Sequence, residues 1–233
     1  SGGLGTACYG IVKGLAAATD VHVTFVIPKS QGNELTAGNL KLLSADRVFL
    51  SKAIDNTENW SNIQFVEVRS QLLPYLTPQT FSSNTTIVSK DKIVSEGENV
   101  KIEFSGKYGP NLFNEINNYA IVAQMIASET RFDVIHAHDW LTFRAAIAAK
   151  KISGKPLVVH IHSTDFDRSG GAINPDIYNI EKQGMEVADH IIAVSNKIKN
   201  RIIEQYHISP SKITTIYNGI NQGNSAEAKK RSK

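Results

Sequence analysis

Two kinds of apolar pattern alternate along the second half of the chain. Apolar residues at helical spacing predict helices over residues 113–129, 141–151, 176–188 and 196–206. Ser195 suits the N-cap of the last helix. Short apolar runs between the helices predict strands over residues 134–137, 156–161, 190–194 and 213–217. This alternation is typical of βαβ units, so we expect an α/β fold with a Rossmann-like parallel sheet flanked by helices.

The first half begins in the same way and then loses its pattern. A helical pattern over residues 6–19 follows a glycine-rich opening, and the apolar run at 21–27 is ended by Pro28. A strand that is apolar on both faces suits the interior of a parallel sheet. Residues 29–110 hold only short strand-like pieces, so we expect irregular structure with a small hairpin there, and no chemistry. These pieces lie at residues 48–50, 63–69, 84–88 and 101–104.

Composition excludes several classes of protein. Hydrophobic residues make up 41% of the 233 residues and charged residues 20%, which suits a packed core. The balance of 25 Lys and Arg against 22 Asp and Glu gives +3, too small an excess to indicate a nucleic-acid partner. Cys8 stands alone, so the chain has no intrachain disulfide framework. We expect one domain over residues 1–220, followed by a flexible basic tail or the start of a linker over residues 221–233.

The sequence contains no segment that resembles a membrane span. No apolar run reaches the ~20 residues of a membrane helix. The chain also opens without the charged segment of a signal peptide. We therefore expect a soluble, cytoplasmic protein with no membrane partner.

The glycine-rich opening is the first candidate contact with a ligand. Gly2, Gly3 and Leu4 precede a helix, whose first N–H groups and dipole favour a phosphate or a sugar hydroxyl. A plain glycine turn is the alternative. Cys8 stands where a dinucleotide-binding fingerprint has its third glycine, and the strand at 21–27 is not followed by the acid that holds a ribose. A dinucleotide cofactor is therefore disfavoured.

The second candidate follows the strand at 134–137. His136 and His138 are two residues apart, so they share a face of the sheet. Asp139 comes next, at the N-terminus of a predicted helix, where its charge is favoured. The alternatives are that Asp139 is simply a helix cap and that His136 is a satisfied core histidine.

The next strand ends in a similar pair, His160 and His162. Two H-x-H pairs on adjacent strands contain the ligand types of a zinc or iron site. Metal hydrolases of this kind sit on closed barrels, which this chain is too short to form. We therefore expect no metal, with His162 facing a ligand and His160 structural. Arg168, close to two glycines, suits a loop over the site or an ordinary surface loop.

Five segments together resemble a known family. They are SGGLG before a helix, HAHDW and VVHIHS after strands, and then VADHIIAVS and TTIYNGI. The same motifs occur in this order in glycogen and starch synthases and their glycosyltransferase relatives. These enzymes have the GT-B fold, in which two Rossmann-like domains face each other across a cleft. The resemblance covers residues 1–220 and implies the N-terminal, acceptor-side domain.

The resemblance also implies a reaction. Enzymes of this family transfer glucose from ADP-glucose or UDP-glucose to an α-1,4-glucan with retention of configuration, and they require no metal or other cofactor. By resemblance, Asp139 is the acid of the HDW motif implicated in catalysis, and His162 contacts the donor glucose. The remaining substrate-binding residues expected on this basis are Gly2, Gly3, Leu4, His138 and Trp140.

The chain departs from the family pattern at both ends. Nothing precedes Ser1, where the family has a lysine and the first, central strand of the sheet, and the carboxy-terminal domain that binds most of the nucleotide is missing. We expect a fragment that is inactive alone, with a strand supplied by exchange or by an oligomer. The alternatives are another GT-B glycosyltransferase with a different donor and acceptor, a non-catalytic carbohydrate- or nucleotide-binding module, and a metal hydrolase.

Overall fold

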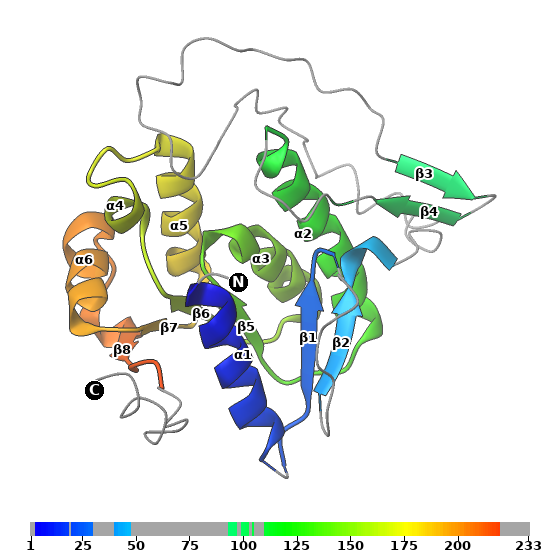
Figure 1. The fold of residues 1–233 in the computed structure, drawn as a ribbon, viewed down its shortest axis with the longest axis horizontal. Coiled ribbons are helices and arrows are strands. Elements are labelled where there is room, and N and C mark those ends of the chain that lie inside the picture. The colour runs from blue at the N-terminus through cyan, green and yellow to red at the C-terminus, as the bar shows by residue number, and fades with distance from the viewer. Residues whose placement is uncertain are drawn as a thin grey trace, which may run out of the picture.

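The computed structural model describes residues 3–18, 20–29, 40–47, 93–96, 99–102, 104 and 110–219 (Figure 1). The strands expected at 48–50, 63–69 and 84–88, Gly2, and the tail over 221–233 lie outside the described residues.

A four-stranded parallel sheet forms the centre of the C-terminal half. Its strands are hydrogen-bonded in the order β5 (Ile135–His138), β6 (Leu157–Ile161), β7 (His190–Ala193) and β8 (Ile213–Thr215). They are connected by α3 (Trp140–Ser153), then α4 (Asp165–Arg168) and α5 (Pro175–Val187), then α6 (Asn196–Tyr206) and a 3-10 turn at Pro210–Lys212. Because the strand order follows the chain and such crossovers are right-handed, α3, α5 and α6 lie on one face. The expected α/β class is confirmed.

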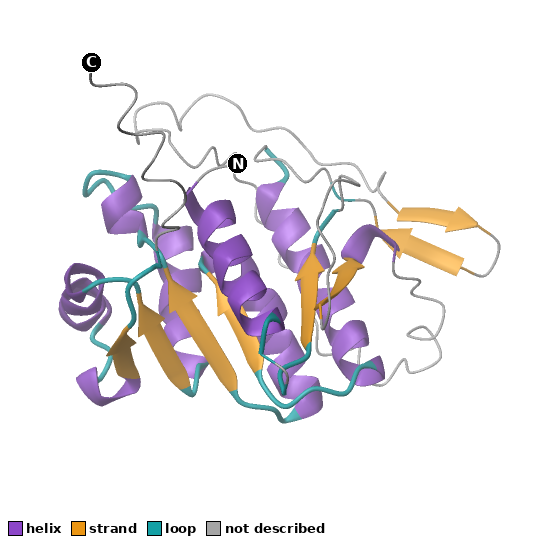
Figure 2. Cartoon of the chain, turned by 60° about the horizontal axis from the view of Figure 1, so that its bottom comes forward, coloured by secondary structure: helices purple, strands orange, loops and turns teal. Residues whose placement is uncertain are grey.

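The two faces of this sheet differ in character. Leu157, Val159 and Ile161 of β6 are buried in the core that also contains residues of α3, α5 and α6. His160 alternates with them and points to the other face. There α1 (Gly3–Ala16) lies, across the strands from α3 and α5 (Figure 2). The sheet therefore has an apolar face and a histidine-bearing face.

A second, two-stranded parallel sheet consists of β1 (Val23–Ile27) and β2 (Leu40–Ser44), with a 3-10 turn at Ala45–Arg47. It rests on α2 (Leu112–Glu129), where the hydroxyl of Tyr119 donates a hydrogen bond of 2.9 Å to the carbonyl of Val26. The expected hairpin is present as antiparallel β3 (Ile93–Glu96) and β4 (Asn99–Ile102).

Within the described residues, β1 and β5 are both edge strands, since β1 pairs only with β2 and β5 only with β6. Edge strands expose unpaired N–H and C=O groups, which another strand can pair with. The strand that would do so stays a prediction.

Helix α5 packs closely on α3 because of one glycine. A β-carbon at Gly184 would lie 2.2 Å from Cδ2 of Phe143, far inside van der Waals contact. Phe143 is itself fully buried. The absence of a side chain at Gly184 therefore sets how near the two helices come.

Candidate functional site

The C-terminal ends of β5 and β6 bring Asp139 and His162 together. β5 ends at His138, which is paired in register with His160 of β6. The backbone N–H of Asp139 donates to the carbonyl of His160 (3.0 Å), and the backbone N–H of His162 donates to Oδ1 of Asp139 (2.8 Å). The carboxylate is therefore fixed between the ends of two adjacent strands.

The backbone of Asp139 is strained. Its φ of 55° and ψ of 171° lie in a region that non-glycine residues rarely adopt, at a cost of about 1–3 kcal/mol. Asp139 stands at the N-cap of α3, yet its side chain makes no capping hydrogen bond. The backbone of Asp139 is therefore at the N-cap position, as the helix-cap alternative expects, but its carboxylate does not cap the helix. Strain of this kind clusters at functional sites.

The environment of Asp139 also shifts its protonation. The residue is 6% exposed. Burial raises the pKa of its carboxyl from 3.8 to about 6. The N–H of His162, the charge of Arg168 and the N–H of Ser163 lower this pKa, while the carboxylate of Glu181 raises it. Asp139 is therefore a carboxylate at neutral pH that can accept a proton in a slightly acidic range.

Four histidines, three from β5 and β6 and His162 just after β6, bring their rings close together on the face of the sheet where α1 lies. The ring centroids are 4.4 Å apart for His136 and His138, and 4.4 Å apart for His160 and His162. Nδ1 of His138 lies 3.1 Å from Nε2 of His162, so one ring donates a hydrogen bond to the other. Burial and the neighbouring imidazoles lower the pKa of His138 to about 3 and that of His162 to about 4. Both rings are neutral at physiological pH.

His160 is the buried member of this cluster. It is 4% exposed, and neither ring nitrogen has a hydrogen-bond partner among the described residues. Burial lowers its pKa to about 3, which matches a neutral ring in a stack. Its structural role stays a prediction.

Helix α1 adds Cys8 to this face. Sγ of Cys8 and one ring nitrogen each of His138 and His162 all lie within 4.8 Å of one another. The same spacing holds for ligand atoms of His136, His138 and His160. These are residue types that hold zinc, but we assign no ion to either group. Burial and the nearby Asp139 raise the pKa of the Cys8 thiol to about 11, so the thiol is protonated.

The other expected contact residues fall into two groups. Gly3 and Leu4 begin α1, the helix that brings Cys8 to His138. The side chain of Trp140 instead packs in the core, 4% exposed, with its ring 6.0 Å from that of Phe113. Its substrate role stays a prediction, while its packing gives it a structural one.

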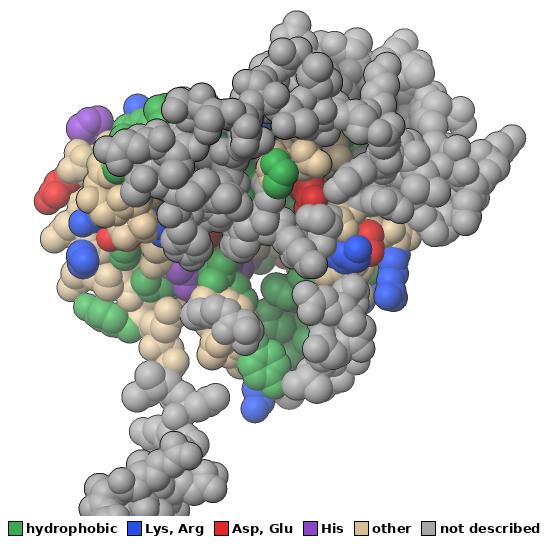
Figure 3. All heavy atoms as spheres, turned by 45° about the horizontal axis from the view of Figure 1, so that its top comes forward, with side chains coloured by type: hydrophobic (Ala, Val, Ile, Leu, Met, Phe, Trp, Pro, Cys, Tyr) green, Lys and Arg blue, Asp and Glu red, His purple; other side chains and the backbone are tan. Residues whose placement is uncertain are grey.

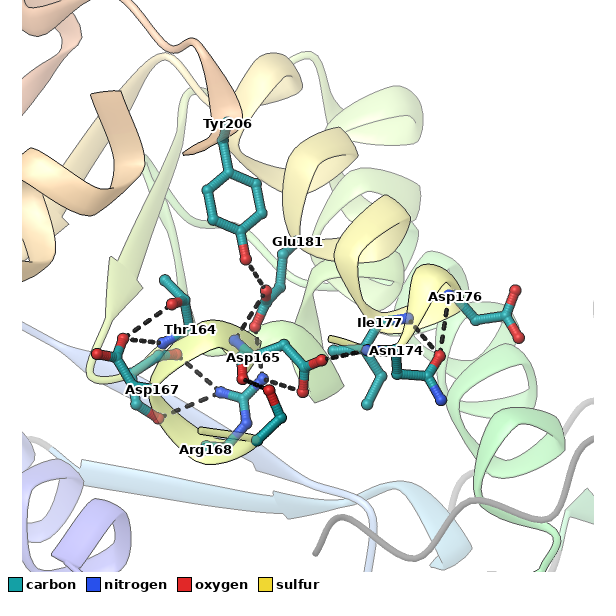
Figure 4. A network of polar contacts seen from close by, with 11 residues as sticks. Thr164, Asp165, Asp167, Arg168, Asn174, Asp176, Ile177, Glu181 and Tyr206 are labelled. Atoms are coloured by element: carbon teal, nitrogen blue, oxygen red, sulfur yellow. Dashed lines mark hydrogen bonds and ion pairs between the residues drawn. The ribbon is translucent and has the colours of Figure 1, made fainter. Parts of the chain in front are cut away.

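Arg168 does not extend freely over the site. It ends α4, and its Nη1 donates to the carbonyl of Ser163 (2.8 Å), while its Nη2 lies 2.5 Å from Oε1 of Glu181 (Figure 4). Its side chain is only 13% exposed. Sequence reasoning missed Glu181 entirely. The available signal was its place on the buried face of α5, four residues after Ile177 and three before Gly184.

Figure 3 shows histidine and hydrophobic side chains gathered near the middle of one face of the molecule.

No helix in the described part of the chain combines the length and apolar character that a membrane crossing requires.

The sequence model of glycosyltransferase family 4 matches residues 89–223, more than half of the chain. The chain belongs to glycosyltransferase family 4. It is a GT-B glycosyltransferase domain, and Asp139, His138 and His162 all lie within the matched region.

This family 4 domain has curated relatives of different specificity. It is 34% identical over 94 residues to a glycogen synthase of Mycobacterium tuberculosis, covering 39% of this chain and 23% of that protein. It is 33% identical over 97 residues to a D-inositol 3-phosphate glycosyltransferase of Thermobispora bispora, again covering 39% and 23%. The alignments thus span about a quarter of the length of these relatives.

A solved sucrose-phosphate synthase from Thermosynechococcus elongatus has the same fold as the family 4 domain. The TM-score is 0.50 at 13% identity, and the superposition covers 92% of this chain and 86% of that chain. At this identity the likeness concerns the fold alone.

Proposed function

We propose that this family 4 glycosyltransferase domain is the N-terminal, acceptor-side part of a retaining glucosyltransferase of the glycogen and starch synthase type. The donor is ADP-glucose or UDP-glucose, and the acceptor is an α-1,4-glucan. One observation carries the proposal: Asp139, strained and buried, is held by the N–H of His162 at the carboxyl edge of a parallel sheet. This edge is where open α/β folds bind ligands.

The proposed roles follow from the chemistry of each group. Asp139 is ionised at neutral pH and 6% exposed, so its charge acts strongly on a nearby acceptor hydroxyl or on positive charge at the sugar carbon. His162 is neutral, and its ring can donate or accept one hydrogen bond to a sugar hydroxyl. Gly3 and Leu4 begin a helix, whose free N–H groups suit the leaving diphosphate. These roles need no metal and no further cofactor.

We further propose that the domain acts together with a C-terminal domain and shows little turnover alone. Stabilising a leaving diphosphate requires groups on both sides of the cleft. The edge strands β1 and β5 also suit an added strand, from the parent protein or from a second copy.

The test is turnover by the parent enzyme with ADP-glucose or UDP-glucose and glycogen. We expect glucose incorporation with one donor, and a loss of at least about 100-fold in Asp139→Asn and in His162→Ala. Absence of incorporation with both donors would contradict the glucan claim.

A different donor and acceptor form the second candidate. The D-inositol 3-phosphate glycosyltransferase is almost as similar to this chain as the glycogen synthase is, at 33% against 34%. Screening donors and acceptors separates the two. A non-catalytic binding module would instead bind glucan equally well after Asp139→Ala or His162→Ala.

A further inference from the structure

A polar network lies buried beside the Asp139 site, built from three separate elements (Figure 4). Thr164 is the N-cap of α4 and Asp165 its first residue, Glu181 comes from the middle of α5, and Tyr206 is the last residue of α6. Asp165 is 3% exposed and Glu181 is 2% exposed. Burying two carboxylates costs free energy unless each is paired and hydrogen-bonded.

Among the described residues, the hydrogen bonds and the ion pair of Glu181 are made with the segment after β6 and with α6. Its Oε1 pairs with Nη2 of Arg168 at 2.5 Å, and its Oε2 accepts from the backbone N–H of Asp165 at 3.1 Å. The hydroxyl of Tyr206 also donates to Oε2. The carboxylate thus holds the segment after β6 against two helices.

Arg168 continues the network toward the site. Its Nη1 donates to the carbonyl oxygen of Ser163 at 2.8 Å and contacts its hydroxyl at 3.2 Å. Ser163 directly follows His162, whose N–H donates to Asp139. A continuous path of hydrogen bonds and one peptide unit therefore joins Glu181 to Asp139.

We propose that Glu181 is a positioning residue, which acts through Arg168 to hold the backbone of His162 and Ser163 against the carboxylate of Asp139. Hydrophobic side chains of similar size in place of both Glu181 and Arg168 are often neutral for stability, so stability alone does not require this buried pair. Only a carboxylate also orients the guanidinium, whose planar fork reaches Glu181 and Ser163 at the same time. The consequence for catalysis rests on the proposed function, but the positioning itself does not.

The proposal has an electrostatic signature at Asp139. The groups that face Asp139 are Cys8 from α1, His138 at the end of β5, His162 after β6, Arg168 from α4 and Glu181 from α5. The two histidines are neutral, and so is the thiol. Arg168 and Glu181 are thus the charges that act on Asp139 from these elements, in opposite directions.

Glu181→Gln in the 233-residue chain tests the proposal without substrate. Titration of the Asp139 carboxyl by carbon-13 NMR should show its midpoint shifted down, on the order of 0.5 pH unit, because a negative charge is lost while Arg168 remains. Amide hydrogen exchange should show the His162 N–H less protected, because Arg168 is no longer oriented. The midpoint responds to the lost charge in either case, so a purely structural role of Glu181 would lower stability and leave the protection of the His162 N–H unchanged.

Asp189→Asn is the matched control. It removes a carboxylate that pairs with Lys150 at 2.6 Å and accepts from the N–H of Leu157, at the opposite end of β6. Its Asp139 titration and His162 protection should equal those of the wild type. Unchanged protection of the His162 N–H in folded Glu181→Gln would overturn the proposal, whether or not the Asp139 midpoint moves.

If Glu181→Gln does not fold, Tyr206→Phe provides the same test, since it removes only one donor to Glu181. With one contact of its carboxylate lost, Glu181 should orient Arg168 less firmly, so the His162 N–H should lose protection by a smaller amount, and unchanged protection would overturn the proposal. In the parent enzyme, Glu181→Gln should lower kcat more than it changes KM for the donor. The NMR test needs no turnover, so its outcome is independent of the activity assay. The positioning role of Glu181 can therefore be refuted while glucosyl transfer is confirmed, and glucosyl transfer can be refuted while the positioning role is confirmed.

Discussion

The backbone N–H of His162 donates a hydrogen bond of 2.8 Å to Oδ1 of Asp139. Asp139 also donates its own N–H to His160 (3.0 Å), so the two strand ends are joined in both directions. The contact holds a carboxylate that is 6% exposed at the edge where a ligand is expected.

Activity of the parent enzyme should rise with pH through the pKa of Asp139. Burial raises this pKa to about 6, and the proposed role requires the ionised form. The acid limb of kcat/KM should therefore have its midpoint near pH 6, and it should be absent from the residual activity of Asp139→Asn. A rate profile that is flat between pH 5 and pH 7, the window around that value, would show that the charge of Asp139 is not needed.

Stability should depend on pH in the opposite sense. A carboxyl whose pKa is raised from 3.8 to about 6 on folding contributes stability below pH 3.8, which is lost as pH rises through about 6. Replacing it with a neutral amide removes this loss. Asp139→Asn should thus be more stable than the wild type at pH 7.5, by up to roughly 3 kcal/mol, and the difference should shrink toward pH 4. Urea unfolding at the two pH values measures it, and an equal difference at both would contradict the assignment.

Local periodicity was enough to predict most of the larger sheet and its helices. The helix over residues 196–206 coincides with α6, and Ser195 caps it by accepting from the N–H of Ile198. The strand expected over 213–217 ends earlier, at Thr215: the N–H of Ile216 still donates to the carbonyl of Ala193 in β7, but the side chains of Ile216 and Tyr217 are exposed. β2 was missed because its apolar run lies in the stretch where the pattern fades.

Some features of the candidate site could be predicted from the sequence and others could not. His138, Asp139 and His162 stand at or after the ends of adjacent parallel strands, so the sequence could predict that they lie close together. The strain at Asp139 could not be predicted, since the residue type there is one that ordinary caps also use. Glu181 and Tyr206 meet across 25 residues of sequence, and only the packing of α5 against α6 brings them together. Contacts of this kind leave no local pattern.

Chelation should leave activity unchanged. The proposed roles of Asp139 and His162 are a charge and a hydrogen bond, neither of which needs a Lewis acid. His138 and His162 already bond to each other at 3.1 Å. Dialysis of the parent enzyme against EDTA should therefore retain full turnover, and elemental analysis should find less than one zinc per chain. Loss of turnover on chelation, with recovery on adding Zn²⁺, would instead assign a metal to the cluster that includes Cys8.

Gly184→Ala should destabilise the domain. The new methyl group would lie 2.2 Å from Cδ2, 2.6 Å from Cγ and 3.0 Å from Cβ of Phe143, so the base of this fully buried side chain would have to shift. Overpacking of this kind costs roughly 2 kcal/mol or more, which exceeds the gain in helix propensity. Gly10→Ala in α1 is the control, since nothing lies within 4 Å of its added methyl group. The control should gain about 0.5–1 kcal/mol in urea unfolding, and equal effects of the two changes would contradict this packing.

Because of the backbone strain at position 139, a glycine there should make the protein more stable than an alanine does, the reverse of the usual order in a helix. Both Asp139→Gly and Asp139→Ala remove the carboxylate, so they differ mainly in how well they tolerate φ 55° and ψ 171°. Glycine adopts these angles without the clash of a β-carbon, and we expect it to be more stable than alanine by about 1–2 kcal/mol. At the exposed position Asn200, inside α6, the order should reverse, with alanine about 1 kcal/mol more stable. If alanine were also the more stable residue at position 139, the strain would be absent. Asp139 would then owe its position to its hydrogen bonds alone.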